Sequence, residues 1–218
     1  MKHRGALITF EGLDGCGKTT QWELETERLS RQGRPVIATK EPGGTPVGKL
    51  IREIVLNAAV GPLSAPTELA LVFAARSQHI EEVILPALRS GSVVLCDRFT
   101  DSTIAYQGYG RGIPLDTIRN LDGLLCRGVF PDLTLLLDID PETAAQRTGS
   151  RNRAALQNET RFEKEGLEFF RRVRQGYLEI ACQEPARVRV VDAGKSISEV
   201  HEQVSRAIDE FLKERNCV

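Results

Sequence analysis

Short apolar segments alternate with longer stretches of helical periodicity along this chain of 218 residues. Strands are predicted at 7–11, 35–39, 92–96, 133–138 and 188–191, and the most apolar of them suit a sheet that is covered on both faces. Helices are predicted at 18–31, 46–57, 66–89, 115–126, 141–148, 160–183 and 196–214. The alternation indicates βαβ units, and we expect an α/β fold in which helices flank a five-stranded parallel sheet, within one domain over 1–218.

A glycine-rich segment follows the first predicted strand directly. It reads Gly-Leu-Asp-Gly-Cys-Gly-Lys-Thr, and the spacing G-x-x-x-x-G-K-[ST] between a strand and a helix is typical of a phosphate-binding P-loop. Its backbone N–H groups surround an anion, its lysine supplies a cation for the β- and γ-phosphates, and its threonine offers a hydroxyl to Mg²⁺. We therefore predict a P-loop NTPase fold and ATP binding by the whole loop: Gly12, Leu13, Asp14, Gly15, Cys16, Gly17, Lys18 and Thr19.

Composition and charge exclude several classes of function. The formal net charge is −1, which argues against a protein that grips nucleic acid through a basic surface. The five cysteines form no C-x-x-C pair, and the three histidines lack metal-ligand spacing, so we expect free thiols and no zinc site. With no secretory signal and no apolar run near the ~20 residues that span a bilayer, we expect a cytoplasmic protein without membrane partners.

Charged residues follow two further predicted strands. Asp97-Arg98 follows the third strand and Glu41 the second, and ligands of open parallel sheets bind beyond the carboxyl ends of strands. Asp97 is suited to holding a metal ion through water together with Thr19, and the planar guanidinium of Arg98 to holding an acceptor phosphate. For Asp14 and Glu41 the residues alone leave two interpretations open, a local role in a turn or a contact with the substrate.

A polar segment at 149–160 predicts a mobile loop between two helices. Phosphoryl transfer needs cations over the moving group, and a closing lid can supply them, so we expect a lid at about 148–161 with Gly149-Ser150 as its hinge. The arginines around it are Arg147, Arg151, Arg153 and Arg161.

Several motifs together resemble those of the bacterial thymidylate kinases. They lie at 10–20, 39–45, 67–68 with 74–76, 97–99 with 101–107, and 131–138, and the segment Ala-Tyr-Gln-Gly-Tyr-Gly-Arg-Gly at 105–112 is the most specific to this family. The resemblance implies transfer of the γ-phosphoryl group of ATP to thymidine monophosphate (dTMP), on the path to dTTP. It also implies Mg²⁺ and a homodimer with one site in each chain.

Catalytic roles follow from the resemblance residue by residue. Lys18, Arg98 and Arg153 would stabilise the transferred group, Arg153 from the lid because the P-loop carries Gly15 where some relatives keep an arginine. Such catalysis rests on positioning and charge stabilisation, so no strong general base is required. The metal would be held by Thr19 and, through water, by Asp97.

The resemblance also assigns contacts with the acceptor nucleotide. Arg98 and Arg52 would bind its phosphate, Arg76 a thymine carbonyl, and Asp14 the 3′-hydroxyl. Tyr106 would pack where a ribose 2′-hydroxyl would otherwise lie. The full expected set is Asp14, Glu41, Arg52, Phe73, Arg76, Arg98, Thr103, Tyr106 and Gln107.

The base pocket departs from the family pattern at one position. Thr103 and Gln107 would address the edge of the base, but the phenylalanine usual four residues before the base-reading Arg76 is replaced by Val72. Phe73 follows it, and two outcomes stay open: Phe73 leans in to stack on thymine, or the stacking is weaker.

Two other functions remain alternatives at this point. One is another nucleoside monophosphate kinase with a different base preference. The other is a P-loop ATPase or switch protein, which would hydrolyse ATP without a nucleotide acceptor and would leave the arginines at the strand ends unexplained.

Overall fold

Five parallel strands form the central sheet of the computed structural model, which describes residues 5–155, 161–162 and 165–216. They lie side by side in the order β2-β3-β1-β4-β5. Their bounds are β1 Ala6–Glu11, β2 Val36–Lys40, β3 Val93–Asp97, β4 Leu133–Asp138 and β5 Val188–Asp192. The predicted α/β class and parallel sheet are confirmed, and no predicted strand end is off by more than one residue.

Burial of the strands follows their apolar sequences. Every residue of β1 is buried, and β3 and β4 are buried at every position but the last. The edge strands β2 and β5 retain exposed positions. Central parallel strands need cover on both faces, because neither face can remain in contact with water.

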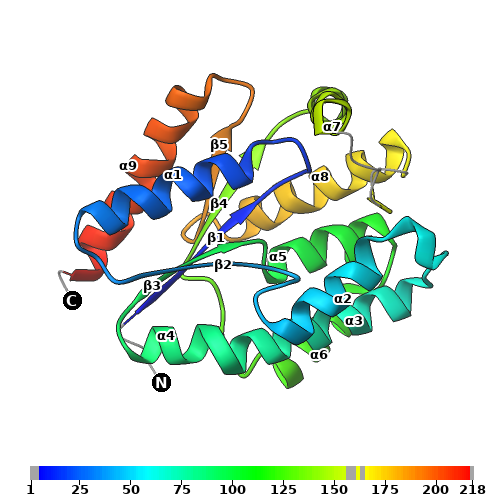
Figure 1. Ribbon diagram of the computed structural model, residues 1–218, viewed down its shortest axis with the longest axis horizontal. Coiled ribbons are helices and arrows are strands. Elements are labelled where there is room, and N and C mark those ends of the chain that lie inside the picture. Colours follow the sequence, from blue (N-terminus) through cyan, green and yellow to red (C-terminus); the bar gives the residue numbers. More distant parts are fainter. Residues whose placement is uncertain (1–4, 156–160, 163–164, 217–218) are drawn as a thin grey trace.

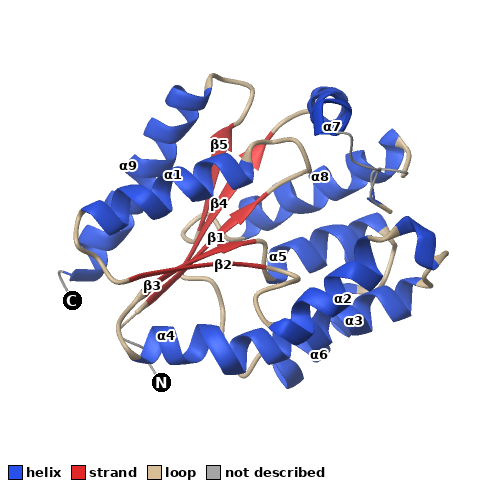
Figure 2. Cartoon of the chain, viewed as in Figure 1, coloured by secondary structure: helices blue, strands red, loops and turns tan. Residues whose placement is uncertain are grey.

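Helices cover the sheet from both sides (Figures 1 and 2). α1 (Lys18–Arg31) and α9 (Ile197–Asn216) pack together on one face, and α4 (Leu85–Arg89) and α8 (Leu167–Gln183) contact the other. Right-handed crossovers explain why α1 lies opposite α4 and α8, since the chain moves from β1 to β2 in one direction across the sheet and from β2 through β3 and β4 to β5 in the opposite direction.

The remaining helices lie mostly beyond the sheet, where α2, α3 and α6 run side by side (Figure 1). None of the helices in the described ranges is both long enough and apolar enough to cross a bilayer. Two of the short segments, η2 and η3, are π-helical and η1 is a 3₁₀ turn. The bounds are α2 Pro46–Leu56, η1 Ala58–Val60, α3 Ala65–His79, η2 Ile80–Ile84, α5 Thr100–Thr103, η3 Ile104–Gly110, α6 Leu115–Leu125 and α7 Pro141–Ala155.

The helical run α5–η3 was not expected from the sequence. Its threonines and glycines have low helix propensity, so the local pattern gives no helical signal. Tertiary packing stabilises it instead. A Cβ atom on Gly110 would lie 2.7 Å from the ring of Phe169 in α8, so the missing side chain allows the two helices to approach closely.

Two boundaries near the expected lid are also wrong. α7 continues to Ala155 rather than ending at 148, so the first part of the expected loop is helical. α8 begins at Leu167 after Gly166, rather than at 160. The arginines and alanines at 151–155 are good helix formers, which outweighs the Gly149-Ser150 pair within the helix. Residues 156–160 lie outside the described part of the chain.

Candidate active site

A cavity of about 560 Å³ lies at the carboxyl ends of the strands. Its wall combines the P-loop, the ends of β2 and β3, and residues of α2, α3, α5, η3 and α7. The strand order explains why these segments meet. β1 and β3 are neighbours in register, with Phe10 beside Asp97, so the P-loop after β1 and Arg98 after β3 emerge next to each other.

The P-loop adopts a conformation that requires glycine. Gly12, Gly15 and Gly17 all have positive φ angles, of 134°, 87° and 94°. At Gly15 the space is also closed, because a Cβ atom there would lie 2.4 Å from the carbonyl oxygen of Ala144 in α7. The loop therefore cannot carry an arginine at this position without displacing α7.

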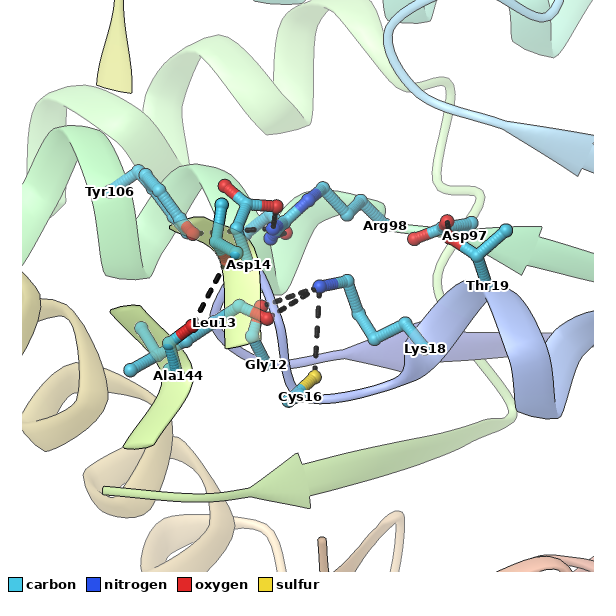
Figure 3. A network of polar contacts seen from close by, with 12 residues as sticks. Gly12, Leu13, Asp14, Cys16, Lys18, Thr19, Asp97, Arg98, Tyr106 and Ala144 are labelled. Atoms are coloured by element: carbon cyan, nitrogen blue, oxygen red, sulfur yellow. Dashed lines mark hydrogen bonds and ion pairs between the residues drawn. The ribbon is translucent and has the colours of Figure 1, made fainter. Parts of the chain in front are cut away.

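Lys18 folds back over the loop (Figure 3). Its Nζ donates to the carbonyl oxygens of Gly12 at 3.0 Å and Leu13 at 2.8 Å, and it is only 6% exposed. Cys16 lies beneath, with Sγ 3.7 Å from the same ammonium. Burial raises the pKa of the Cys16 thiol, so this cysteine stays neutral and fills the loop as a small apolar residue.

Thr19 and Asp97 form a pair that suits a hydrated metal ion. Thr19 Oγ1 donates to Asp97 Oδ2 at 3.2 Å, while the buried Oδ1 of Asp97 accepts no hydrogen bond from any described residue. Mg²⁺ keeps several waters and needs only one or two protein oxygens, and a vacant carboxylate oxygen beside a hydroxyl provides them. Within the described ranges no group of three His, Cys, Asp or Glu side chains could bind a metal directly.

Arg98 is the centre of the polar network in Figure 3. Its φ of 71° is unusual for a residue with a side chain, and such strained positions cluster at functional sites. Nη2 donates to Asp14 Oδ1 at 2.8 Å and to the hydroxyl of Tyr106 at 3.2 Å. Burial opposes the charge, but the facing Tyr106, Asp14 and Tyr177 raise the pKa of the guanidinium well above its ordinary value. Arg98 is thus a permanent, rigidly held cation.

A second arginine lies beside Arg98. Arg52, from α2, donates from Nη1 to the carbonyl oxygen of Pro42 at 2.9 Å and lines the same cavity. Burial and the repulsion of Arg98 lower its pKa. Because each of these two cations destabilises the other, an anion bound between them would stabilise both.

A buried ion pair holds a third arginine. Arg76 of α3 donates from Nε to Glu41 Oε2 at 2.7 Å, and the side chains are only 1% and 4% exposed. His79 binds the other oxygen of Glu41 through Nδ1 at 2.8 Å. Arg76 and Thr103 both line the cavity, and Nη1 of Arg76 and the hydroxyl of Thr103 are buried without a hydrogen-bond partner among the described residues. They are unused groups that a ligand can satisfy.

The opposite wall of this pocket comes from η3. Gln107 donates from Nε2 to Glu68 Oε1 at 2.9 Å, which fixes the orientation of its amide. Tyr106 lines the cavity with its ring edge-to-face against Phe162, the centroids 5.4 Å apart. Glu68 also accepts two hydrogen bonds from Arg111, so the carboxylate that holds the Gln107 amide is itself held by a charged partner.

Comparisons with known proteins identify the family. The family model described as thymidylate kinase matches residues 10–204. A thymidylate kinase of Pelotomaculum thermopropionicum is 50% identical over 209 residues, covering 96% of this chain and 95% of that protein. The chain belongs to the thymidylate kinase family.

Further relatives support the same family over its full length. A thymidylate kinase of Ectopseudomonas mendocina is 46% identical, covering 96% of this chain and 97% of that protein. The crystal structure of thymidylate kinase from Ehrlichia chaffeensis matches with a TM-score of 0.75 at 36% identity, covering 94% of this chain and 98% of that one. The resemblance seen in the sequence motifs is confirmed.

One expected residue is not part of the cavity of this family member. Phe73 is 1% exposed, belongs to the apolar cluster beneath α3, and packs against the guanidinium of Arg76 at 5.3 Å from its ring centroid. Val72 lines the cavity instead. Val72 rather than Phe73 is thus the side chain of α3 at the cavity wall, because the turn of α3 that brings Arg76 into position points Phe73 toward the core. A contact of Phe73 with the substrate stays a prediction.

The lid residues are only partly described. The side chain of Arg153 lies outside the described part of the chain. Arg147 of α7 does line the cavity, and its Nη1 donates to the carbonyl oxygen of Ala193 at 2.9 Å. Arg161 bonds to the carbonyl oxygens of Ile54 and Asn57 at the end of α2.

Sequence reasoning missed Ser102 and Tyr177. Both hydroxyls accept hydrogen bonds from Nη1 of Arg98, at 3.0 and 3.1 Å. Ser102 follows the Asp97-Arg98 motif closely enough to have been considered. Tyr177 lies in α8, 79 residues after Arg98, and no local pattern connects it with the site.

Proposed function

We propose that this protein transfers the γ-phosphoryl group of ATP to dTMP, giving ADP and dTDP in the synthesis of dTTP. The observation that carries the proposal is the family match over nearly the whole chain, with the P-loop and Arg98 facing one cavity. We further propose a cytoplasmic location, where both nucleotides are available.

We propose that the P-loop forms the donor half of this site. Its positive-φ glycines allow close approach of the backbone N–H groups to the phosphates, and α1 begins at Lys18 with its positive end toward them. Lys18 would exchange its bonds to the loop carbonyls for the β- and γ-phosphates. Thr19 and Asp97 would hold Mg²⁺, which neutralises phosphate charge when bound.

The acceptor half would be formed by the arginine groups. The cation pair Arg98 and Arg52 suits the phosphate of dTMP, and the vacant Nη1 of Arg76 suits a thymine carbonyl. Glu41 would act on the substrate through Arg76, whose guanidinium it orients. Asp14, close to the phosphate as the partner of Arg98, would accept from the 3′-hydroxyl.

Three residues of α5 and η3 would select the base and the sugar of the acceptor: Thr103, Tyr106 and Gln107. Thr103 offers a buried hydroxyl without a described partner, and the fixed amide of Gln107 faces the same cavity. The ring of Tyr106 would fill the space that a ribose 2′-hydroxyl needs. An apolar wall that merely leaves an added hydroxyl unpaired rejects it only about a hundredfold, so the discrimination would rest on the volume that the ring occupies.

Transfer then requires an oxygen of the acceptor phosphate to attack the γ-phosphorus in line as the bond to ADP breaks. Arg98 and Lys18 stabilise the charge on the moving group, and no general base is needed because the attacking oxygen is already anionic. We propose that Arg153 adds a third cation from the lid at 148–161, within a chain that forms one domain over 1–218.

We propose a homodimer built on α2, α3 and α6, which form one side of the molecule (Figure 1). α2 exposes Val47, Leu50 and Ile54 there, and α6 exposes Leu124 at 75%. Exposed large apolar side chains on neighbouring helices are typical of an interface. Sedimentation equilibrium of the wild type and of Leu50→Asp tests it: a wild-type monomer, or an unchanged dimer in the variant, would contradict this interface.

A coupled ADP-release assay over a panel of nucleoside monophosphates tests the activity. We expect dTMP to be the best acceptor and little ADP release in the absence of an acceptor. Preference for another monophosphate would favour the altered base pocket marked by Val72. Rapid ADP release without any acceptor would favour an ATPase or switch protein.

A further inference from the structure

Glu11 is a buried carboxylate directly behind the active-site wall. It is the last residue of β1 and is 0% exposed. No substrate contact has been assigned to it, and Ser102 and Arg98 lie between it and the cavity. A buried carboxylate is costly unless every oxygen is hydrogen-bonded, so its partners indicate its purpose.

Both oxygens of Glu11 hold the surroundings of Arg98. Oε1 accepts from the backbone N–H of Phe99 at 2.7 Å, at the residue that follows the strained backbone of Arg98. Oε2 accepts from the hydroxyl of Ser102 at 2.5 Å and from that of Tyr177 at 3.1 Å. These are the same two hydroxyls that accept hydrogen bonds from Nη1 of Arg98.

The direction of these hydrogen bonds depends on Glu11. A hydroxyl has one proton, and it accepts from Arg98 only if that proton points elsewhere. The hydroxyls of Ser102 and Tyr177 are 2.8 Å apart, so one can donate to the other instead of to Glu11, but the proton of the second hydroxyl must then go to the carboxylate. An ionised carboxylate only accepts, so Glu11 turns both hydroxyls into acceptors for the guanidinium.

We propose that Glu11 is a positioning residue for the acceptor phosphate, which holds the backbone and side chain of Arg98 in their binding geometry through Phe99, Ser102 and Tyr177. The inference rests on the proposed role of Arg98 with dTMP. Glu11 itself touches no substrate, and it orients the cation that does. Burial, with a contribution from Asp101, raises the pKa of Glu11 to about 7, so the carboxylate is ionised, and both hydroxyls are oriented as acceptors, above that pH.

Glu11→Gln tests the proposal with little change in shape. The amide offers one acceptor oxygen where the carboxylate offers two, so either the N–H of Phe99 or the two hydroxyls must face an NH₂ group. We expect the Kd for dTMP, measured by titration calorimetry, to rise about 10- to 100-fold, as for loss of charged hydrogen bonds. The Kd for ATP should stay within about twofold, since the P-loop is not involved.

Asp132→Asn provides a matched control at the other end of β1. Asp132 also accepts a backbone N–H, that of Leu7 at 2.8 Å, and an arginine contact, from Arg215 at 2.6 Å. We expect this variant to lower the melting temperature while both nucleotide affinities stay unchanged. Equal weakening of dTMP and ATP binding in Glu11→Gln, or unchanged dTMP binding in the folded variant, would overturn the proposal.

A second carboxylate variant keeps the proposal testable if Glu11→Gln fails to fold. Glu11→Asp retains two acceptor oxygens but shortens their reach, so its Kd for dTMP should lie between those of the wild type and the Gln variant. Unchanged dTMP affinity in Glu11→Asp would then refute the role. Failure of the proposed function looks different, because the wild type itself would not bind or phosphorylate dTMP.

Discussion

The buried pair of Glu41 and Arg76 gives a stability prediction whose size follows from the structure. In Arg76→Met the volume is largely kept, but the carboxylate of Glu41 loses its 2.7 Å contact while it remains only 4% exposed. Removing one partner of a buried ion pair costs about 3–5 kcal/mol. His79 still donates toward Glu41, which favours the low end, and the lost bond to the carbonyl oxygen of Phe99 adds about 1 kcal/mol. We expect a loss of about 4 kcal/mol.

Urea unfolding measures this loss through the single tryptophan. Trp22 donates to the carbonyl oxygen of Leu95 in β3 at 2.9 Å, so its fluorescence reports on the sheet. The decisive comparison is the double variant Glu41→Gln/Arg76→Met. It should be more stable than Arg76→Met alone, because the second change removes an unpaired buried charge.

An exposed pair serves as the control for this experiment. Arg31→Met breaks the surface pair with Glu27, whose side chains are 76% and 56% exposed, and should cost less than about 1 kcal/mol. If the two changes at Glu41 and Arg76 were simply additive, or if Arg76→Met cost no more than Arg31→Met, the reasoning about buried charge would be refuted.

Two further predictions concern the cavity and a third the carboxylate behind its wall. Arg98→Ala should lower the rate of phosphoryl transfer by about a hundredfold or more while ATP binding stays largely intact, and unchanged turnover of dTMP would refute its role. Val72→Phe should lower the Kd for dTMP about two- to tenfold by stacking on the base, whereas Val72→Leu should not. Because the pKa of Glu11 rises from 4.5 to about 7 on folding, its contribution to stability is present below pH 4.5 and is lost as pH rises through 7. Unfolding free energies of Glu11→Gln and wild type should therefore shift in favour of the variant by up to about 3 kcal/mol between pH 5 and 8, and parallel profiles would contradict this.

The sequence by itself determined the P-loop, the proposed donor half of the site. The P-loop is a contiguous motif, and its three glycines encode the conformation of the loop through their own φ angles. The strands could also be predicted from local sequence, since each is a short apolar run, and the composition of β1 and β4 indicates burial on both faces. Asp97 and Arg98 could be placed beside the loop because all parallel strands end at the same edge of a sheet.

Tertiary structure alone decided which side chains form the proposed acceptor half. α3 is apolar around most of its circumference, so the pattern could not tell whether Val72 or Phe73 faces the cavity, and core packing placed Phe73 inside. The helical run at 100–110 depends on contact with α8 rather than on its own propensities.

The network around Glu11 depends on contacts over long sequence distances. Tyr177 meets Glu11 across 166 residues, and such a contact exists only once α8 has packed against the sheet. A local motif specifies backbone conformation within a few residues, whereas the direction of a buried hydrogen bond is set by whichever distant groups share the same enclosed space.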